Sequence, residues 1–309
     1  MAKARAIVKR RKAVRNIKKI TKTMQMIATA KFQKSLKRAT GTKPFTLKVR
    51  ELVAELAANI GDVQHPLLRE PGEADRTNRI ALVVLTSNRG LAGAYNGSVL
   101  RAAMQFIRQQ ESSGKTVDLY VAGKKGISYF NFQKKPMTKK AEAKDTPRFE
   151  DVEQQANYFI DQFTSGKIDA VHVAYMNFVS AGVQRAEVTT LLPLSALKAV
   201  EPAKKGTAPA APAAATPTHP KLATVYEFSP SAKELLDELL PLTLKTALFQ
   251  TYLDATTSEH VSRMVAMKSA TDNADKMQKA LTMKYNRARQ SQITTELSEI
   301  MGGVEAMKS

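Results

Sequence analysis

The C-terminal part of this chain carries a helical pattern that is too long for a compact domain. From Ser231 onward, apolar residues recur mostly every three or four positions, no proline follows Pro241, and no glycine lies between Pro241 and Gly302. At 1.5 Å per residue, positions 241–305 would form a helix of roughly 100 Å. A compact chain of 309 residues would have a diameter of about 50 Å. We therefore expect this helix to project and to need a partner for its apolar stripe.

The N-terminal segment supplies that partner. Between residues 2 and 60 the helical pattern is interrupted only at Gly41 and Pro44. One long segment enters the middle of the chain and the other leaves it, so the two run antiparallel. Their near-3.5 spacing predicts a left-handed coiled coil with Met24 near Arg263. The C-terminal helix is longer by about 17 residues. Its unpartnered apolar tip, which marks an interface, comprises Ile293, Leu297, Ile300, Met301 and Val304.

Positive charge is concentrated near the N-terminus. The chain holds 48 Lys and Arg against 28 Asp and Glu, for a formal net charge of +20. Residues 1–50 contain 17 basic side chains and no acidic one, whereas residues 223–309 contain 10 basic and 11 acidic side chains. Such a segment needs an anionic partner or very polar surroundings. One interpretation is a basic coiled-coil protein that binds nucleic acid, but no base-reading motif accompanies the charge and the C-terminal helix is close to neutral.

The middle of the chain has the pattern of an α/β domain, because predicted strands alternate with predicted helices. The strands are expected at 79–86, 117–122, 169–178, 185–192 and 222–228, and the helices at 98–110, 123–130 and 152–163. The sheet should be mainly parallel. We therefore divide the chain into an N-terminal coiled-coil helix at 1–60, an α/β domain at 61–228 and a C-terminal coiled-coil helix at 229–309. The Ala/Pro-rich stretch at 201–220 is predicted to be a flexible insert.

The sequence offers no credible catalytic, cofactor or metal site. It contains no cysteine, and its four histidines are scattered without ligand spacing. The Gly-Lys-Thr sequence at 114–116 resembles the end of a phosphate-binding loop, but position 109 is Gln109 and a helix precedes it where a strand is required. Gly90 and Gly93 could cradle a phosphate, although a tight strand-to-helix turn is favoured. No apolar run approaches the roughly 18–20 residues of a membrane span. We expect a structural or mechanical role without direct membrane insertion.

Three segments together resemble the gamma subunit, or central stalk, of F-type rotary ATP synthase. Residues 17–31 are similar to that family's signature helix, and residues 87–96 look like its glycine-turn motif. The most specific match runs from 258 to 303. Two positions depart from the family pattern, with Asn88 in place of the usual Asp and Ala92 where Cys is frequent.

The resemblance implies a long antiparallel coiled coil of the N- and C-terminal helices plus a central Rossmann-like α/β domain. The helices would stand inside a collar of three alpha and three beta subunits, and the α/β domain would rest, with the epsilon subunit, on the membrane rotor ring. The chain would couple proton-driven ring rotation to ATP synthesis or hydrolysis by the beta subunits. It would be a non-catalytic rotor without cofactors or a nucleic-acid partner, peripheral to the cytoplasmic face of a bacterial plasma membrane.

The resemblance also implies contact residues. Contacts with the catalytic subunits are expected at Met24, Arg263, Arg289, Gln290, Thr294 and Glu296, with a lower collar contact at Asn88, Arg89 and Ala92. The foot on the membrane ring is expected at Lys43, Pro44 and Phe45. The alternative for each charged residue is a solvated helix face, and for Met24 it is the coiled-coil seam.

Overall fold

The computed structural model of the chain describes residues 2–60, 65–69, 76–194 and 232–308. Its elements are α1 (Ala2–Ile60), η1 (Pro66–Leu68), β1 (Arg79–Leu85), α2 (Tyr95–Ser112), β2 (Thr116–Ala122), α3 (Lys124–Phe132), β3 (Lys139–Ala141), α4 (Phe149–Thr164), β4 (Ala170–Phe178), β5 (Gln184–Leu192) and α6 (Ala232–Lys308). The predicted insert at 201–220 and the predicted strand at 222–228 lie outside the described residues.

The described strands form one sheet in the order β3-β2-β1-β4-β5. Strand β1 pairs in parallel with β2 and β4, and β2 pairs in parallel with β3. Strand β5 is antiparallel to β4, to which a short turn connects it. The mainly parallel α/β sheet predicted from the alternation of strands and helices is confirmed. The short strand β3 was not predicted, because its Lys-Lys-Ala sequence lacks β-branched residues.

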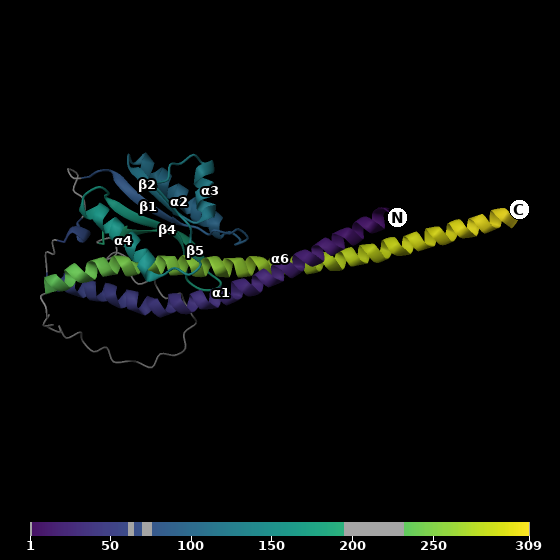
Figure 1. Cartoon of the computed structure of the whole chain (residues 1–309), viewed down its shortest axis with the longest axis horizontal. Coiled ribbons are helices and arrows are strands. Elements are labelled where there is room, and N and C mark those ends of the chain that lie inside the picture. Colours follow the sequence, from purple (N-terminus) through teal and green to yellow (C-terminus); the bar gives the residue numbers. More distant parts are fainter. Residues whose placement is uncertain (1, 61–64, 70–75, 195–231, 309) are drawn as a thin grey trace, which may run out of the picture. The chain divides into compact units, whose positions relative to one another are not determined.

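Helices cover both faces of this sheet. Alternate residues of β1, including Ala81, Val83 and Leu85, belong to a buried core that also contains side chains of α4 and of parts of α1 and α6. The opposite face packs against α2, where the rings of Phe106 and His172 lie 4.7 Å apart. Helices α2 and α3 accordingly lie on one side of the sheet and α4 on the other (Figure 1). The sequence folds this way because β1 is apolar on both faces.

Two compact units divide the chain at positions other than the three predicted segments. The sheet unit comprises Ser35–Gly90 and Tyr95–Ser258, and the helical unit comprises Met1–Lys34, Leu91–Ala94 and Glu259–Ser309. The reason lies in the core of the sheet unit. Side chains from the second half of α1 and the first third of α6, such as Leu56 and Leu244, are buried there with the strands. Both long helices thus contribute to both units.

Helix α1 runs without a break through Gly41 and Pro44, where the sequence predicted an interruption. Proline removes one helical hydrogen bond, but side chains hold this stretch. The Thr42 hydroxyl donates to Gln250 Oε1 over 2.9 Å, and Gln250 Nε2 donates to the carbonyl of Ala39 over 3.3 Å. These bonds connect α1 to α6 on the N-terminal side of the proline.

Candidate functional site

A doubly wound fold binds its ligand beyond the carboxyl ends of the strands, and in this chain a residue of α6 lies in that region. Strand order reverses between β1 and β4, and ligands bind such folds beyond the carboxyl ends of the strands at that point. Near the end of β4, the Ser258 hydroxyl of α6 donates to the carbonyl of Met176 over 3.1 Å, and Ser258 is completely buried. A helix residue therefore fills the space at the end of β4.

The N-terminus of α3 is likewise closed to an anion, because its first amides already have acceptors. The bonds are Lys124 N–H to Asn88 Oδ1 at 3.2 Å, Lys125 N–H to the Ser87 carbonyl at 3.1 Å, and Gly126 N–H to Thr86 Oγ1 at 2.9 Å. Helix N-termini bind phosphate through such amides when they are free.

Asn88, an expected collar contact, makes its hydrogen bonds within the sheet unit. Its Nδ2 donates to the carbonyl of Ala143 over 2.6 Å, and its Oδ1 accepts from the amides of Ala143 and Lys124. Ala92, the second expected contact in this motif, is only 2% exposed. The structure therefore does not present the side chain of Ala92 to a partner.

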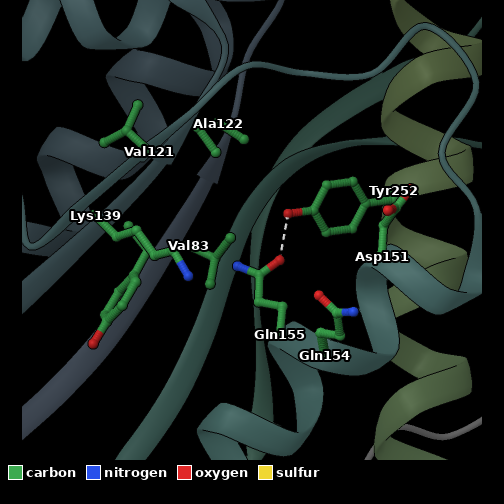
Figure 2. Close-up of a pocket in the computed structure, with 10 residues that line it drawn as sticks. Val83, Val121, Ala122, Lys139, Asp151, Gln154, Gln155 and Tyr252 are labelled. Atoms are coloured by element: carbon green, nitrogen blue, oxygen red, sulfur yellow. Dashed lines mark hydrogen bonds between the residues drawn. The ribbon is translucent and has the colours of Figure 1, made fainter.

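A cavity of about 200 Å³ lies between the sheet, α4 and α6 (Figure 2). Its floor includes Val83 and Val121, and Tyr252 donates to Gln155 Oε1 over 2.7 Å across it. Burial raises the pKa of the Tyr252 hydroxyl, so this group stays protonated. The residues around the cavity include no histidine and no serine or threonine nucleophile. The bond between Tyr252 and Gln155 connects α6 to α4.

A second cavity, of about 370 Å³, lies among α1, α6, β4 and β5. Asp254, which is 7% exposed, accepts a hydrogen bond from Gln250 over 3.1 Å. Nearby, Tyr175 donates to Glu187 over 2.8 Å. Burial raises the pKa of Asp254 to about 6, and Lys43 partly opposes that rise. Across the described residues, no three His, Cys, Asp or Glu side chains gather in a way that could hold a metal ion.

Lys43, Pro44 and Phe45, the expected foot on a membrane ring, lie in the middle of α1 and are exposed. They are part of the continuous helix and do not form a loop. Among the described residues, no helix combines the length and the apolar composition needed to cross a membrane.

Within the helical unit, α1 and α6 pack as an antiparallel pair. The Thr271 hydroxyl donates to Thr21 Oγ1 over 2.8 Å, Lys18 forms an ion pair with Asp275, and the Arg11 guanidinium lies 4.9 Å from the centre of the Tyr285 ring. As the residue number falls along α1, that of its partner rises along α6. The antiparallel arrangement predicted from the sequence is confirmed.

The register of this pair differs from the sequence prediction. Because Thr21 meets Thr271, Met24 lies level with about residue 267 or 268, more than one helical turn from Arg263. Arg263 is instead bonded to Glu259 over 2.7 Å, and its side chain is 11% exposed. Its expected contact with a catalytic subunit therefore has to compete with an ion pair inside the helix.

The C-terminal part of α6, from Arg289 to Val304, is largely exposed. Ile293, Leu297, Ile300, Met301 and Val304 are between 47% and 67% exposed. Arg289, Gln290, Thr294 and Glu296 are also exposed. Thr294 donates to the carbonyl of Gln290, and Glu296 accepts from Gln292, so two of the expected coupling residues are partly engaged within the helix.

The sequence did not predict that the side chain of Leu91 would be exposed. Leu91 is 62% exposed and adopts a left-handed backbone conformation with φ of 62°. Its position between Gly90 and Gly93 could have indicated this exposure, because glycines of this kind mark a turn. The sequence alone did not indicate that Ala92 would be buried and Leu91 exposed.

Comparisons with known proteins identify the family. A family model described as ATP synthase matches residues 3–307. An ATP synthase gamma chain of Rhodopirellula baltica is 42% identical over 310 residues and covers 100% of both chains. The chain belongs to the ATP synthase gamma chain family. A second relative of that name, from Leptospira biflexa, is 37% identical over 308 residues, covering 99% of this chain and 100% of its own.

Chains in solved structures of ATP synthases share the fold. A chain of the mitochondrial ATP synthase of Euglena gracilis, from an OSCP/F1/c-ring structure in rotational state 3, matches with a TM-score of 0.62 at 16% identity. The match covers 99% of this chain and 95% of that one. A chain from the central stalk and c-ring structure of Tetrahymena thermophila matches with a TM-score of 0.56 at 20% identity, covering 81% and 99%. The expected fold, a pair of long terminal helices with a central α/β domain, is confirmed.

Proposed function

We propose that this chain is the central rotor subunit of a proton-translocating F-type ATP synthase. It would transmit rotation of a membrane ring to the catalytic beta subunits during ATP synthesis or hydrolysis. The observation that carries the proposal is the 42% identity to a gamma chain over the full length of both chains. The antiparallel helical pair with an exposed apolar end supports the same role, because such an end needs an enclosing partner.

The mechanism that we propose is differential binding. Rotation brings one face of the helical unit after another to chemically equivalent sites, and only contacts that differ between open and closed beta conformations shift the affinity for nucleotide. This chain contributes contacts and no catalytic group. Two features support a non-catalytic role. Ser258 of α6 lies at the carboxyl end of β4, and the first backbone amides of α3 already donate hydrogen bonds within the chain.

The partners follow from the same proposal. Three alpha and three beta subunits would surround the helical unit, while the epsilon subunit and the membrane ring would bind the sheet unit near Lys43, Pro44 and Phe45. The chain would be peripheral to the cytoplasmic face of a bacterial plasma membrane, which agrees with the bacterial origin of its relatives. The excess of basic side chains near the N-terminus would face acidic collar loops. Nucleic acid is not among the partners proposed.

Reconstitution tests this function. Purified alpha and beta subunits of a bacterial relative should assemble with the chain into a complex that hydrolyses ATP and turns a probe fixed to the sheet unit. Replacing Ile293, Leu297 and Ile300 with Ser should weaken assembly, because these exposed apolar side chains would lose their apolar surroundings. The matched control replaces Val179 and Val183, exposed side chains near the β4–β5 turn, and should assemble normally. Failure of the unmodified chain to assemble would contradict the proposal.

A further inference from the structure

Arg50 of α1 is a half-buried cation for which the sheet unit provides no counter-ion. Its Nε atom is buried and has no hydrogen-bond partner among the described residues. The ion pairs between described side chains do not include its guanidinium either. An arginine stays protonated in proteins, so this group carries a full positive charge. Buried charges are otherwise paired, because an unpaired one is costly.

The influences on the pKa of Arg50 point to the same lack of a partner. Burial has the largest effect and lowers this pKa, whereas the nearby Tyr175 raises it. A neighbouring carboxylate would raise it more strongly, but none of the described carboxylates is among these influences. The guanidinium therefore has room in its surroundings for an external anion.

Arg50 lines the cavity of about 370 Å³ among α1, α6, β4 and β5, all of whose residues belong to the sheet unit. The two acidic residues of this cavity are bonded to other neighbours. Glu187 accepts from the Tyr175 hydroxyl over 2.8 Å, and Asp254 accepts from Gln250 over 3.1 Å. The cavity thus contains two carboxylates with donors of their own and one guanidinium without an acceptor.

The lining of the cavity indicates the class of anion. Leu191 and Ala247 give it apolar walls, so a ligand with an apolar body fits beside Arg50. The charges of Glu187 and Asp254 disfavour a phosphate dianion, whereas a single carboxylate brings only one negative charge. A guanidinium binds a carboxylate through two parallel hydrogen bonds. Pockets for small molecules have volumes of about 300–1,000 Å³, a range that includes this cavity.

We propose that this cavity binds a small monocarboxylate with a short apolar body, and that Arg50 holds the carboxylate group. Lys43, which also lines the cavity, adds a second positive charge. The apolar body of the ligand lies against Leu191 and Ala247. The inference does not depend on the proposed function, because every residue of the site belongs to the sheet unit and no partner subunit takes part.

Butyrate is a suitable probe, and butyramide is its uncharged counterpart of nearly the same shape. With the purified full chain at constant ionic strength, butyrate should raise the unfolding temperature in a saturable manner. We expect a rise of about 2–4 °C at ten times the dissociation constant that calorimetry gives. Butyramide should cause no such rise, and inorganic phosphate should bind more weakly than butyrate. Equal responses to butyrate and butyramide, or tighter binding of phosphate, would overturn the assignment to a monocarboxylate.

Substitutions at Arg50 test the residue that holds the ligand. Arg50→Met removes the charge and should bind butyrate at least about tenfold more weakly. Without ligand it should unfold at the same temperature as the original or at a higher one, because an unpaired charge is gone. Arg50→Lys keeps the charge but loses the paired hydrogen bonds, so its affinity should be intermediate. The matched control is Lys37→Met, an exposed basic residue of α1 outside the cavity, which should bind butyrate normally.

Two results would overturn the role of Arg50. One is an Arg50→Met variant that binds butyrate as tightly as the original chain. The other is an Arg50→Met variant that unfolds several degrees lower, combined with no saturable response of the unmodified chain, which would make Arg50 a structural residue. These measurements use the chain without other subunits. A failure to assemble with alpha and beta subunits would therefore contradict the proposed function and leave this inference intact.

Discussion

At the scale of single residues, Asp254 is a carboxylate whose environment makes the stability of the chain depend on pH. Burial raises its pKa from 3.8 to about 6, with Glu187 adding to the rise, while Gln250 and Lys43 oppose it. The folded chain therefore holds a proton that the unfolded chain releases between these two pH values. Stability from this group is fully present below the lower pKa and declines as pH rises through the upper one.

Replacing Asp254 with Asn should remove that decline. Near pH 8 the variant should be more stable than the original by at most about 3 kcal/mol, because the buried charge is gone while the Asn oxygen still accepts from Gln250. Near pH 4 the two chains should be equally stable. Urea unfolding of the full chain at both pH values measures the difference. A variant that is less stable at pH 8 than at pH 4 by as much as the original would show that Asp254 is not the group responsible.

Gly123 illustrates a backbone position that accepts no side chain. Its φ is 102°, and a Cβ there would lie 2.1 Å from the Thr86 carbonyl oxygen. Gly123→Ala should cost roughly 3–5 kcal/mol of unfolding free energy, combining backbone strain with a clash that forces β1 and β2 apart. Gly166→Ala is the matched control, since φ is 70° and nothing lies within 4 Å, so only roughly 1–2 kcal/mol should be lost. Equal losses in urea titrations of the two variants would contradict the clash.

At the scale of elements, the register of α1 against α6 comes from polar pairs inside an otherwise apolar seam. The bond between Thr21 and Thr271 is buried and would be lost after a shift of one turn, although each hydroxyl also bonds to a carbonyl of its own helix. A disulfide requires Cα atoms within about 7 Å. We expect Met24→Cys to crosslink with Met267→Cys, which is level with it, and to fail with Arg263→Cys. Gel mobility after mild oxidation, in a chain with no native cysteine, distinguishes the two registers.

Sequence patterns predicted elements better than contacts. The strand at β1 was predictable because Arg79–Leu85 is an unbroken run of apolar residues after its first position. The bonds that Gln250 makes to Thr42 and Ala39 of α1 were not predictable, because Gln250 is more than 200 residues away in sequence. The ion pair of Arg263 with Glu259 is different, because its partners are only four positions apart on α6, a spacing that favours such a pair. Side-chain partners distant in sequence leave no periodic pattern.

At the scale of the whole molecule, α1 and α6 are the elements shared by the sheet unit and the helical unit. Helix length alone predicted an exposed apolar end on α6, and the exposure of Leu297 and Ile300 agrees with that expectation. Helix length could not predict how much of α1 and α6 would belong to the core of the sheet unit. That depends on which apolar residues of the two helices pack against the strands.

The last turns of α6 should bear load without contributing to folding. Arg289 and Gln290 are exposed and lie beyond Tyr285, which packs against Arg11 of α1, so replacing both with Ala should leave the unfolding temperature of the chain unchanged. In the assembled complex, charge-assisted hydrogen bonds to the collar contribute roughly 1.5–3 kcal/mol each. The double variant should therefore lower ATP turnover at least tenfold while still assembling. The control replaces Lys284 and Arg287, exposed basic side chains about one turn earlier, and should keep most of the turnover. Normal turnover and proton pumping by the double variant would remove Arg289 and Gln290 from the coupling surface and leave the apolar tip as the contact that transmits torque.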